Sequence, residues 1–233
     1  NCSDKITREQ LCRMFDHTNL KAYADKDMLQ TLCEEAKENH CAMVAINSSP
    51  VSYCKELLKD TDIHVGAAIS FPLGQTTVAA KVFEAQNAIE NGADEIDYVI
   101  NIGELKNKNY QYIESEMKAM VELCRSNKVI SKVIFEICYL TEDEIKKVSE
   151  IAKKIKPDYI KTSTGFGTSG AVKEIVRLMK DCVGEDVKVK AAGGIRSWKT
   201  CAEMIDAGAE RIGTSSTIKI LQEFDEVRAG KSI

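Results

Sequence analysis

Two lysines occupy matching places in the chain, each at the end of a strongly apolar run and just before a glycine-rich turn. Lys161 ends one such run, and Lys190 ends the next. A charged side chain is rarely buried unless it has a partner or a purpose. A desolvated lysine beside a second cation loses its proton readily and becomes an amine nucleophile. The pair therefore predicts Schiff-base chemistry.

An amine nucleophile requires a lysine pKa far below the ordinary value. With a pKa of ~10.4, only about one lysine in a few thousand is unprotonated at pH 7. A pKa near 7 would raise that fraction by roughly three orders of magnitude. The alternative is a layer of interior ion pairs that only holds the fold together. Two ammonium groups close together in a low dielectric, however, destabilise both charges unless one of them is neutral.

Three turns rich in glycine and hydroxyl side chains follow the last three apolar runs, at 163–167, 193–197 and 213–216. Each precedes a helical pattern, so backbone N–H groups and a helix N-terminus can converge on an anion. In barrels of eight βα units the phosphate site often follows strands seven and eight. The last two turns therefore predict a phosphate site, although ordinary connecting loops are the alternative. The candidate contacts are Gly193, Gly194, Gly213, Ser215 and Ser216.

Gly165, Gly167 and Gly170 also spell the G-x-G-x-x-G pattern of dinucleotide-binding folds. We reject that interpretation because the following strand has no acidic residue where a ribose hydroxyl would need one. Lys161 would also have no role in such a site. No cofactor is therefore expected.

Short apolar or β-branched runs alternate with longer helical patterns along the whole chain, as in βα units around a parallel sheet. Eight strands in about 230 residues match the usual size of a closed barrel. No linker divides the chain, so we predict an α/β fold with one (β/α)8 TIM-barrel domain over residues 1–233. The predicted strands are 14–18, 42–46, 64–69, 95–101, 131–137, 158–162, 187–191 and 211–213. The predicted helices include 26–39, 77–91, 110–125, 141–155, 169–182 and 197–207, and Thr141 followed by Glu144 predicts a capping box.

Several predicted strands carry charged side chains, although strands of parallel sheets usually read as continuous apolar runs. Because successive side chains alternate, Asp97 faces the barrel interior while its two neighbours face the helices. The same parity applies to the other charged positions. The predicted interior set is Asp16, Asp97, Asn101, Lys132, Glu136, Lys161 and Lys190. These charges gather toward the C-terminal strand ends, where barrel enzymes place their chemistry.

The composition excludes several classes of protein. The formal charge of -4 arises from 32 basic and 36 acidic residues, with no run long enough for a nucleic-acid stripe. No stretch approaches the ~20 apolar residues of a membrane span. Nine scattered cysteines, without zinc-like spacing, indicate reduced thiols. We therefore expect a cytoplasmic protein with no metal and no nucleic-acid or membrane partner.

Five segments resemble the deoxyribose-phosphate aldolase family, a class I, metal-independent group of aldolases. They occur in the family's order across nearly the whole chain: FDHTNLK at 15–21, FPLG at 71–74, EIDYVINIG at 95–103, IKTSTG at 160–165 and VKAAGGIR at 189–196. The resemblance implies a (β/α)8 barrel that reversibly cleaves 2-deoxy-D-ribose 5-phosphate into D-glyceraldehyde 3-phosphate and acetaldehyde. It also implies a small-molecule sugar phosphate as substrate and suggests a homodimer.

The resemblance assigns roles to single residues. Lys161 matches the Schiff-base lysine, Lys190 the lysine that lowers its pKa, and Asp97 the carboxylate of a proton relay. The family's phosphate contacts match Gly165, Gly193, Gly194, Ser215 and Ser216. Asp16 and Thr18 of the first motif are predicted to contact the substrate.

The chain departs from many relatives at three positions, Ala45, Ser48 and Lys188. Relatives often have cysteine and proline at the first two, which lie away from the proposed chemistry. Lys188 takes an inward position that is more often small, where it would crowd or recharge the barrel floor and affect stability more than activity. Two other functions stay open: another Schiff-base barrel, such as a transaldolase-like enzyme, and an inactive barrel that binds a sugar phosphate.

Overall fold

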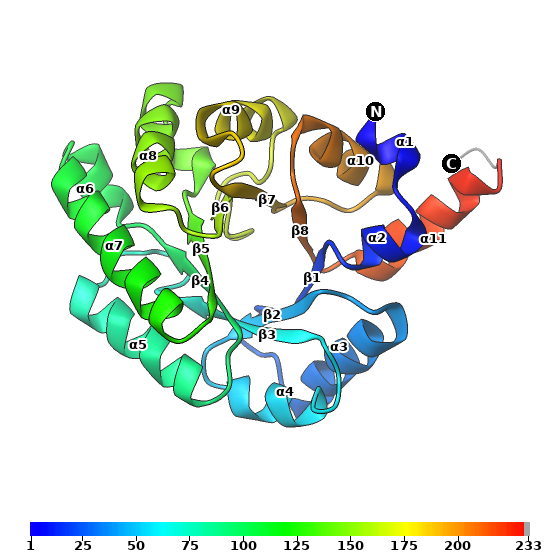
Figure 1. The fold of residues 1–233 in the computed structure, drawn as a ribbon. Coiled ribbons are helices and arrows are strands. Elements are labelled where there is room, and N and C mark those ends of the chain that lie inside the picture. Colours follow the sequence, from blue (N-terminus) through cyan, green and yellow to red (C-terminus); the bar gives the residue numbers. More distant parts are fainter. Residues whose placement is uncertain (231–233) are drawn as a thin grey trace.

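A computed structural model describes residues 1–230 and contains eight parallel strands that form a closed barrel in chain order. Figure 1 shows the strands at the centre and the helices outside them. β8 pairs with β1, with Ile212 beside Phe15, which closes the ring. The predicted (β/α)8 barrel is confirmed, and residues 231–233 of the predicted domain lie outside the described residues. The strands are β1 (Phe15–Thr18), β2 (Met43–Asn47), β3 (His64–Ile69), β4 (Glu95–Val99), β5 (Ile130–Ile134), β6 (Tyr159–Lys161), β7 (Lys188–Ala192) and β8 (Arg211–Thr214).

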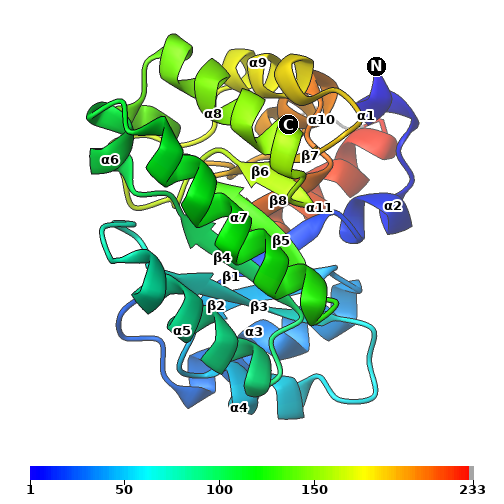
Figure 2. The same ribbon diagram turned by 60° about the vertical axis from the view of Figure 1, so that its left-hand side comes forward.

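Helices connect consecutive strands and cover the outside of the barrel, as Figure 2 shows for α5, α7 and α8. Before β1, two short helices pack on the last two: Ser3 donates a hydrogen bond to Asp206 (2.8 Å), and Arg8 pairs with Asp225 (2.9 Å). Within residues 1–230, no helix has both the length and the apolarity that crossing a bilayer requires. The helices are α1 (Cys2–Lys5), α2 (Arg8–Cys12), α3 (Lys26–Asn39), α4 (Val51–Leu57), α5 (Val78–Glu90), α6 (Ile102–Lys106), α7 (Tyr110–Ser126), α8 (Glu142–Ile155), α9 (Lys173–Val183), α10 (Trp198–Ala207) and α11 (Thr217–Arg228), with a 3-10 turn at Ile137–Tyr139.

All six helices named from the sequence are present, with small differences at their ends. α8 begins with the predicted capping box, in which the side chains of Thr141 and Glu144 each accept a hydrogen bond from the other's backbone N–H. Helices α1, α2, α4, α6 and α11 were not among those predicted. The first four span only 4, 5, 7 and 5 residues, too few to show a helical period.

Two predicted strands are too long at their C-terminal ends. β4 ends at Val99, because the Asn101 side chain accepts a hydrogen bond from the Glu104 N–H (3.1 Å) and caps α6. β5 ends at Ile134, just before Glu136, whose φ of 59° is left-handed and ends the extended backbone. The predictions that these strands reach 101 and 137 are therefore wrong. Both segments form turns at the C-terminal end of the barrel instead.

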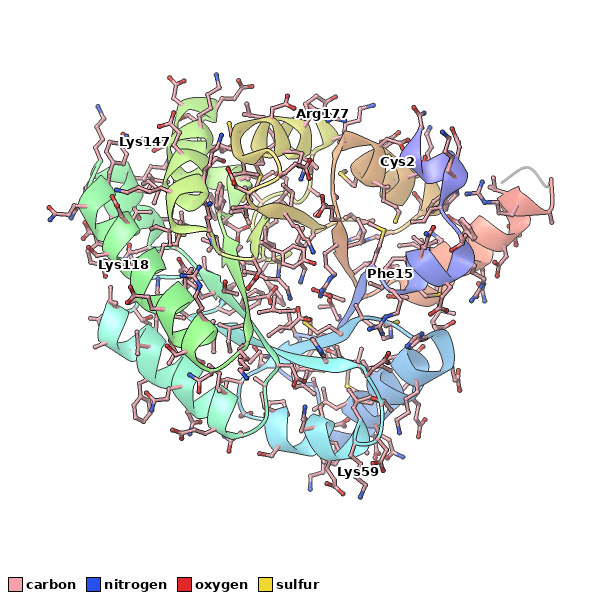
Figure 3. All side chains as sticks on the ribbon, in the orientation of Figure 1. Cys2, Phe15, Lys59, Lys118, Lys147 and Arg177 are labelled. Atoms are coloured by element: carbon pink, nitrogen blue, oxygen red, sulfur yellow. The ribbon has the colours of Figure 1, made fainter. Side chains whose placement is uncertain are left out.

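The main hydrophobic core lies between the strands and the helices. Outward-facing side chains such as Ile96 and Ile160 are completely buried in it, as the predicted alternation requires. Inside the barrel, a separate and much smaller apolar cluster surrounds Met43. Figure 3 shows side chains filling the ring as well as the layer around it, with Lys118 and Arg177 at the outer surface. The rest of the interior is available for charged groups.

Candidate active site

Lys161 and Lys190 lie side by side inside the barrel. β6 ends at Lys161, and the parallel register of β6 and β7 places it opposite Lys190. Paired residues of neighbouring strands project from the same face of the sheet. Both side chains are buried, with 3% and 0% of their surface exposed. The structure therefore brings together the two lysines that stood out in the sequence.

Asp97 reaches the two lysines from β4. Its Oδ2 accepts hydrogen bonds from Lys190 Nζ at 2.8 Å and from Lys161 Nζ at 3.3 Å. Its Oδ1 accepts one from Lys132 Nζ at 2.8 Å, and Lys132 is its neighbour in the β4–β5 register. One buried carboxylate thus contacts three lysines.

Burial lowers the pKa of Lys161 to about 7, because desolvation disfavours the charged amine. The positive charge of Lys190 is the second cause, and Asp97 acts in the opposite direction. The sequence predicted that Lys190 lowers the pKa of Lys161, and burial lowers it more than Lys190 does. Burial by itself would raise the pKa of Asp97. The positive charges of Lys132, Lys190 and Lys161 have the opposite effect and hold that pKa well below its usual range. Near neutral pH the site therefore pairs a partly unprotonated amine with an ionised carboxylate.

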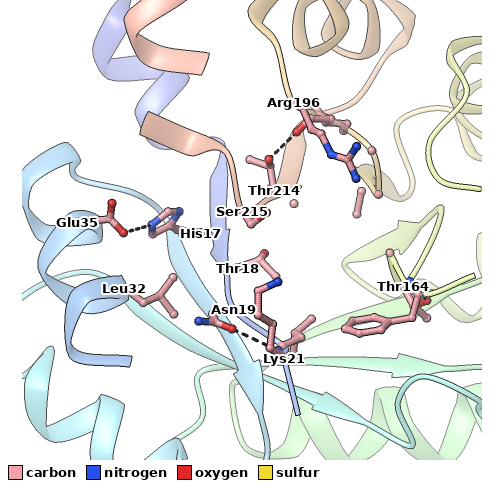
Figure 4. A pocket seen from close by; sticks show the side chains of 18 of the residues that line it. His17, Thr18, Asn19, Lys21, Leu32, Glu35, Thr164, Arg196, Thr214 and Ser215 are labelled. Carbon is pink, nitrogen blue, oxygen red and sulfur yellow. Dashed lines mark hydrogen bonds and ion pairs between the residues drawn. The ribbon is translucent and has the colours of Figure 1, made fainter. Parts of the chain in front are cut away.

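A cavity of about 680 Å³ opens at the C-terminal ends of the strands, and Figure 4 shows it from close by. Lys161 lines this cavity, whereas Lys190 and Asp97 lie behind the lining. The amine of Lys161 is therefore the group of this cluster that a ligand can reach. Among the predicted substrate and phosphate contacts, those that line the cavity are Thr18, Gly165, Gly193, Gly194, Gly213 and Ser215.

Two predicted substrate contacts, Asp16 and Ser216, are not part of the cavity lining found within residues 1–230. Asp16 is fully buried, with Oδ2 at 2.6 Å from Lys190 Nζ and Oδ1 accepting a hydrogen bond from Arg211 at 2.7 Å. Its carboxylate is occupied by these cations, one layer below the cavity. Ser216 directs its N–H to the Thr214 hydroxyl oxygen (2.9 Å) and precedes α11.

The turns after β6 and β7 touch through their backbones. The carbonyl oxygen of Gly193 accepts a hydrogen bond from the Ala171 N–H at 3.0 Å. A Cβ atom on Gly170 would lie 2.1 Å from the same oxygen, so no side chain fits there. The third glycine of the G-x-G-x-x-G pattern therefore allows two turns to pack, which agrees with the rejection of a nucleotide site.

Several cavity residues were not predicted. Lys21 and Arg196, which are exposed, line it from the loops after β1 and β7, as Figure 4 shows. Phe166 also lines it and packs edge-on against Phe71, with ring centroids 5.5 Å apart. The Phe71 ring centroid lies 6.0 Å from Lys161 Nζ. Phe71 and Arg196 belong to the recognised motifs, but only the fold shows that Arg196 lines the cavity and that Phe71 packs against a ring that lines it.

Glu136 fixes the turn that follows Lys161. Its carboxylate accepts hydrogen bonds from both the N–H and the hydroxyl of Thr164, which lines the cavity. The Thr164 hydroxyl oxygen in turn accepts the N–H of Phe166 at 3.0 Å. The sequence placed Glu136 in the interior but gave no sign of this partner.

Lys188 does not crowd the barrel floor, contrary to expectation. It begins β7 and is exposed, with Nζ at 5.6 Å from the ring centroid of Tyr159. Parity turns it toward the same side as Lys190, but as the first residue of β7 it lies at the N-terminal end of the barrel, where its side chain is exposed to solvent. Its charge therefore stays in water, at little cost.

These features define a class of protein: a barrel enzyme with an accessible, partly unprotonated lysine at the C-terminal ends of its strands. The sequence model of the family described as DeoC/LacD family aldolase matches residues 11–223, and the chain belongs to that family.

Named relatives and solved structures agree with this assignment. The deoxyribose-phosphate aldolase of Lactobacillus acidophilus is 58% identical over 94% of this chain and 92% of its own length. That of Thermococcus kodakarensis is 48% identical over 93% and 98%. The structure of the deoxyribose phosphate aldolase from Aeropyrum pernix superposes with a TM-score of 0.89, at 28% identity over 96% of this chain and 95% of that one. The aldolase QR15 gives a TM-score of 0.87 at 36% identity over 95% and 99%.

Proposed function

We propose that this aldolase reversibly cleaves 2-deoxy-D-ribose 5-phosphate into D-glyceraldehyde 3-phosphate and acetaldehyde through a Schiff base on Lys161. The observation that carries the proposal is the buried Lys161 amine, whose pKa is lowered to about 7 at the base of the cavity. The names of the relatives at 58% and 48% identity support this substrate.

The first step is attack of the unprotonated Lys161 amine on the C1 aldehyde of the sugar. The carbinolamine that forms takes up a proton from solvent, loses water and becomes an iminium ion, which carries the positive charge that the free amine lacked. Asp97 Oδ2, 3.3 Å from Nζ, stabilises this cation. The fully buried Lys190 beside it favours the neutral amine before attack.

Cleavage follows when the C3 hydroxyl loses its proton. The C2–C3 bond breaks, its electron pair enters the iminium to give an enamine, and the C3 carbon becomes the aldehyde of glyceraldehyde 3-phosphate. Asp97, which lies behind the cavity lining, accepts the proton through water. Because the lysines hold its pKa well below the usual range, Asp97 passes the proton on instead of keeping it. Protonation of the enamine at C2 and hydrolysis of the new iminium release acetaldehyde and restore Lys161.

The proposed phosphate site lies at the turns that follow β7 and β8. Gly193, Gly194 and Ser215 of these turns line the cavity, and backbone N–H groups in such turns bind anions. The exposed Arg196 of the turn after β7 adds a positive charge there, which suits a phosphate dianion, and Lys21 adds a second charge elsewhere in the lining.

Two assays test the proposal. A retro-aldol assay with 2-deoxy-D-ribose 5-phosphate should yield glyceraldehyde 3-phosphate, and EDTA should not change the rate. Borohydride reduction with acetaldehyde should leave an ethyl group on Lys161, located by peptide mass spectrometry. Lys188→Ala, which changes an exposed lysine, is the matched control and should retain both results.

Each alternative gives a different outcome. A transaldolase-like enzyme would form an adduct on Lys161 but prefer another sugar phosphate. An inactive binding barrel would bind the sugar phosphate without turnover and without an adduct. Either result would contradict the proposed reaction.

A further inference from the structure

A continuous network of buried charges extends from Lys161 toward the N-terminal ends of the strands. Glu95 lies two residues before Asp97 on β4, points to the same side and is completely buried. Its Oε1 is 2.6 Å from Lys132 Nζ and accepts a hydrogen bond from Arg211 Nη1 at 2.8 Å. Its Oε2 lies 2.7 Å from Nδ1 of His64, whose side chain is 42% exposed at the start of β3. The network therefore reaches solvent on the side away from the cavity.

Lys132 joins the two ends of this network. Its Nζ lies 3.1, 2.6 and 2.8 Å from the carboxylates of Asp16, Glu95 and Asp97. These carboxylates raise the pKa of Lys132 above its ordinary value despite burial. A charge change at Glu95 therefore acts on Asp97 and Lys161 through one shared ammonium.

The buried charges of this network, counted within residues 1–230, do not balance if every buried basic group is protonated. The buried part of the network holds three carboxylates, and Lys132, Lys190 and Arg211 match them with three positive charges. His64 lies outside this buried part, because its side chain is partly exposed at the solvent end. Lys161 is the fourth base, and its carboxylate contact, at 3.3 Å, is the longest in the network. In a low dielectric the surplus charge is lost from the base with the weakest contacts. Lys161 is that base.

We propose that Glu95 and Arg211 are positioning residues of the active site, whose opposite charges below the cavity set how readily Lys161 gives up its proton. The proposal rests on the proposed Schiff-base role of Lys161. The charged groups that face Lys161 are Asp97, Lys132, Lys190 and Asp16. Glu95 and Arg211 face Lys132, Asp16, His64 and the hydroxyl of Tyr159.

Removing either charge should shift the titration of Lys161, in opposite directions. Glu95→Gln removes a negative charge and so favours the neutral amine of Lys161. The acid limb of the plot of kcat/KM against pH should therefore move to lower pH. Arg211→Met removes a positive charge, so the limb should move to higher pH. A shift of roughly one pH unit is expected for a unit charge on the order of 10 Å away at an effective dielectric constant of about 20. The double variant should return close to the parent value.

Charge-preserving variants separate this effect from structural damage. Glu95→Asp and Arg211→Lys alter the packing but keep the charge, so they should lower activity without moving the limb. If the buried variants do not fold, His64→Gln at the half-exposed end provides a second test. The hydrogen bond to Glu95 raises the pKa of His64, so the loss of this imidazole takes positive charge away from Glu95 and should move the limb slightly to higher pH.

The pH dependence of trapping by acetaldehyde and cyanoborohydride at Lys161 gives a readout independent of turnover. Shifts of opposite sign for Glu95→Gln and Arg211→Met in both assays would support the proposal. An adduct on Lys161 whose midpoint is the same in every folded variant would overturn it. Absence of any adduct on Lys161 would instead contradict the proposed function itself.

Discussion

The barrel interior and the layer outside β4 each bury lysines against carboxylates, with different consequences. Outside the barrel, Lys81 of α5 pairs with Glu116 of α7 at 2.8 Å, and both are completely buried. Burial lowers the pKa of Lys81, as it does for Lys161 inside the barrel. Lys81, however, donates to Glu116 and to the carbonyl oxygen of Val99, and it is not among the residues that line the cavity at Lys161. A lowered pKa therefore marks an active site only when a ligand can reach the amine.

The number of carboxylates that contact each buried lysine explains why the lysine pKa values shift in different directions. Lys132 contacts three and its pKa rises, whereas Lys81 contacts one and its pKa falls. Lys161 has one carboxylate, at 3.3 Å, and a cation beside it, so burial lowers its pKa as well. Burial is common to all three, and the local charge balance determines the direction of each shift.

The largest effect on activity is expected from Lys161→Ala. Without the amine no iminium can form, so the retro-aldol rate should fall at least about 10³-fold. Affinity for inorganic phosphate, measured by calorimetry, should be largely unchanged because the glycine turns are intact. Near-normal turnover by the Lys161→Ala variant would contradict the claim that Lys161, unlike Lys81, is the amine that reacts.

Asp97→Asn should separate iminium formation from cleavage. Turnover should fall about 10²–10⁴-fold, because the proton acceptor is lost. Asp97 raises the pKa of Lys161, so its loss should lower that pKa further and leave more free amine near neutral pH. Acetaldehyde trapping at Lys161 should therefore persist while cleavage is slow. Loss of trapping in a folded variant would show that Asp97 is needed to hold the amine in place.

Lys81→Met should give the opposite pattern, loss of stability with little loss of chemistry. It leaves Glu116 buried without its partner, which typically costs about 3–5 kcal/mol of unfolding free energy. Urea unfolding measures this loss, and the double variant with Glu116→Leu should recover part of it. Activity per folded molecule should stay near normal. A large loss of kcat at normal stability would make Lys81 a functional residue.

The smallest effect is expected from the packing of the turns. Gly170→Ala would place its Cβ against the Gly193 carbonyl oxygen, which has to move. Because Gly193 belongs to the proposed phosphate site, KM should rise several-fold while kcat changes less. Gly184→Ala is a control for the loss of a glycine, since its Cβ would meet no other atom and only its positive φ is affected. An equal change in KM for both variants would contradict this expectation.

The sequence alone predicted the barrel and the central lysines because these depend on local alternation. Lys161, Lys190 and Asp97 each follow from the period of two within one short strand. The partners of Glu95 could not be predicted in this way, because Arg211 lies 116 residues away along the chain. Their contact depends on how eight strands are staggered around the closed ring.

Two further differences have similar causes. Asp16 has the parity of a cavity residue, but its depth along β1 places it below the cavity, and depth is not encoded in the alternation. The approach of Gly170 to Gly193 joins two loops whose paths depend on tertiary contacts. The sequence therefore predicted the glycine-rich turns, but it did not predict how these turns pack against each other.

Direct titration of Lys161 is the most decisive measurement. The side-chain amine can be followed by NMR with isotope-labelled lysine, and Lys161→Ala identifies its signal. We expect a midpoint at a pH of about 7, with the amine unprotonated above it and activity lost as the pH falls below it. An amine that stays protonated up to a pH of about 10, the ordinary value for lysine, would contradict the proposed chemistry.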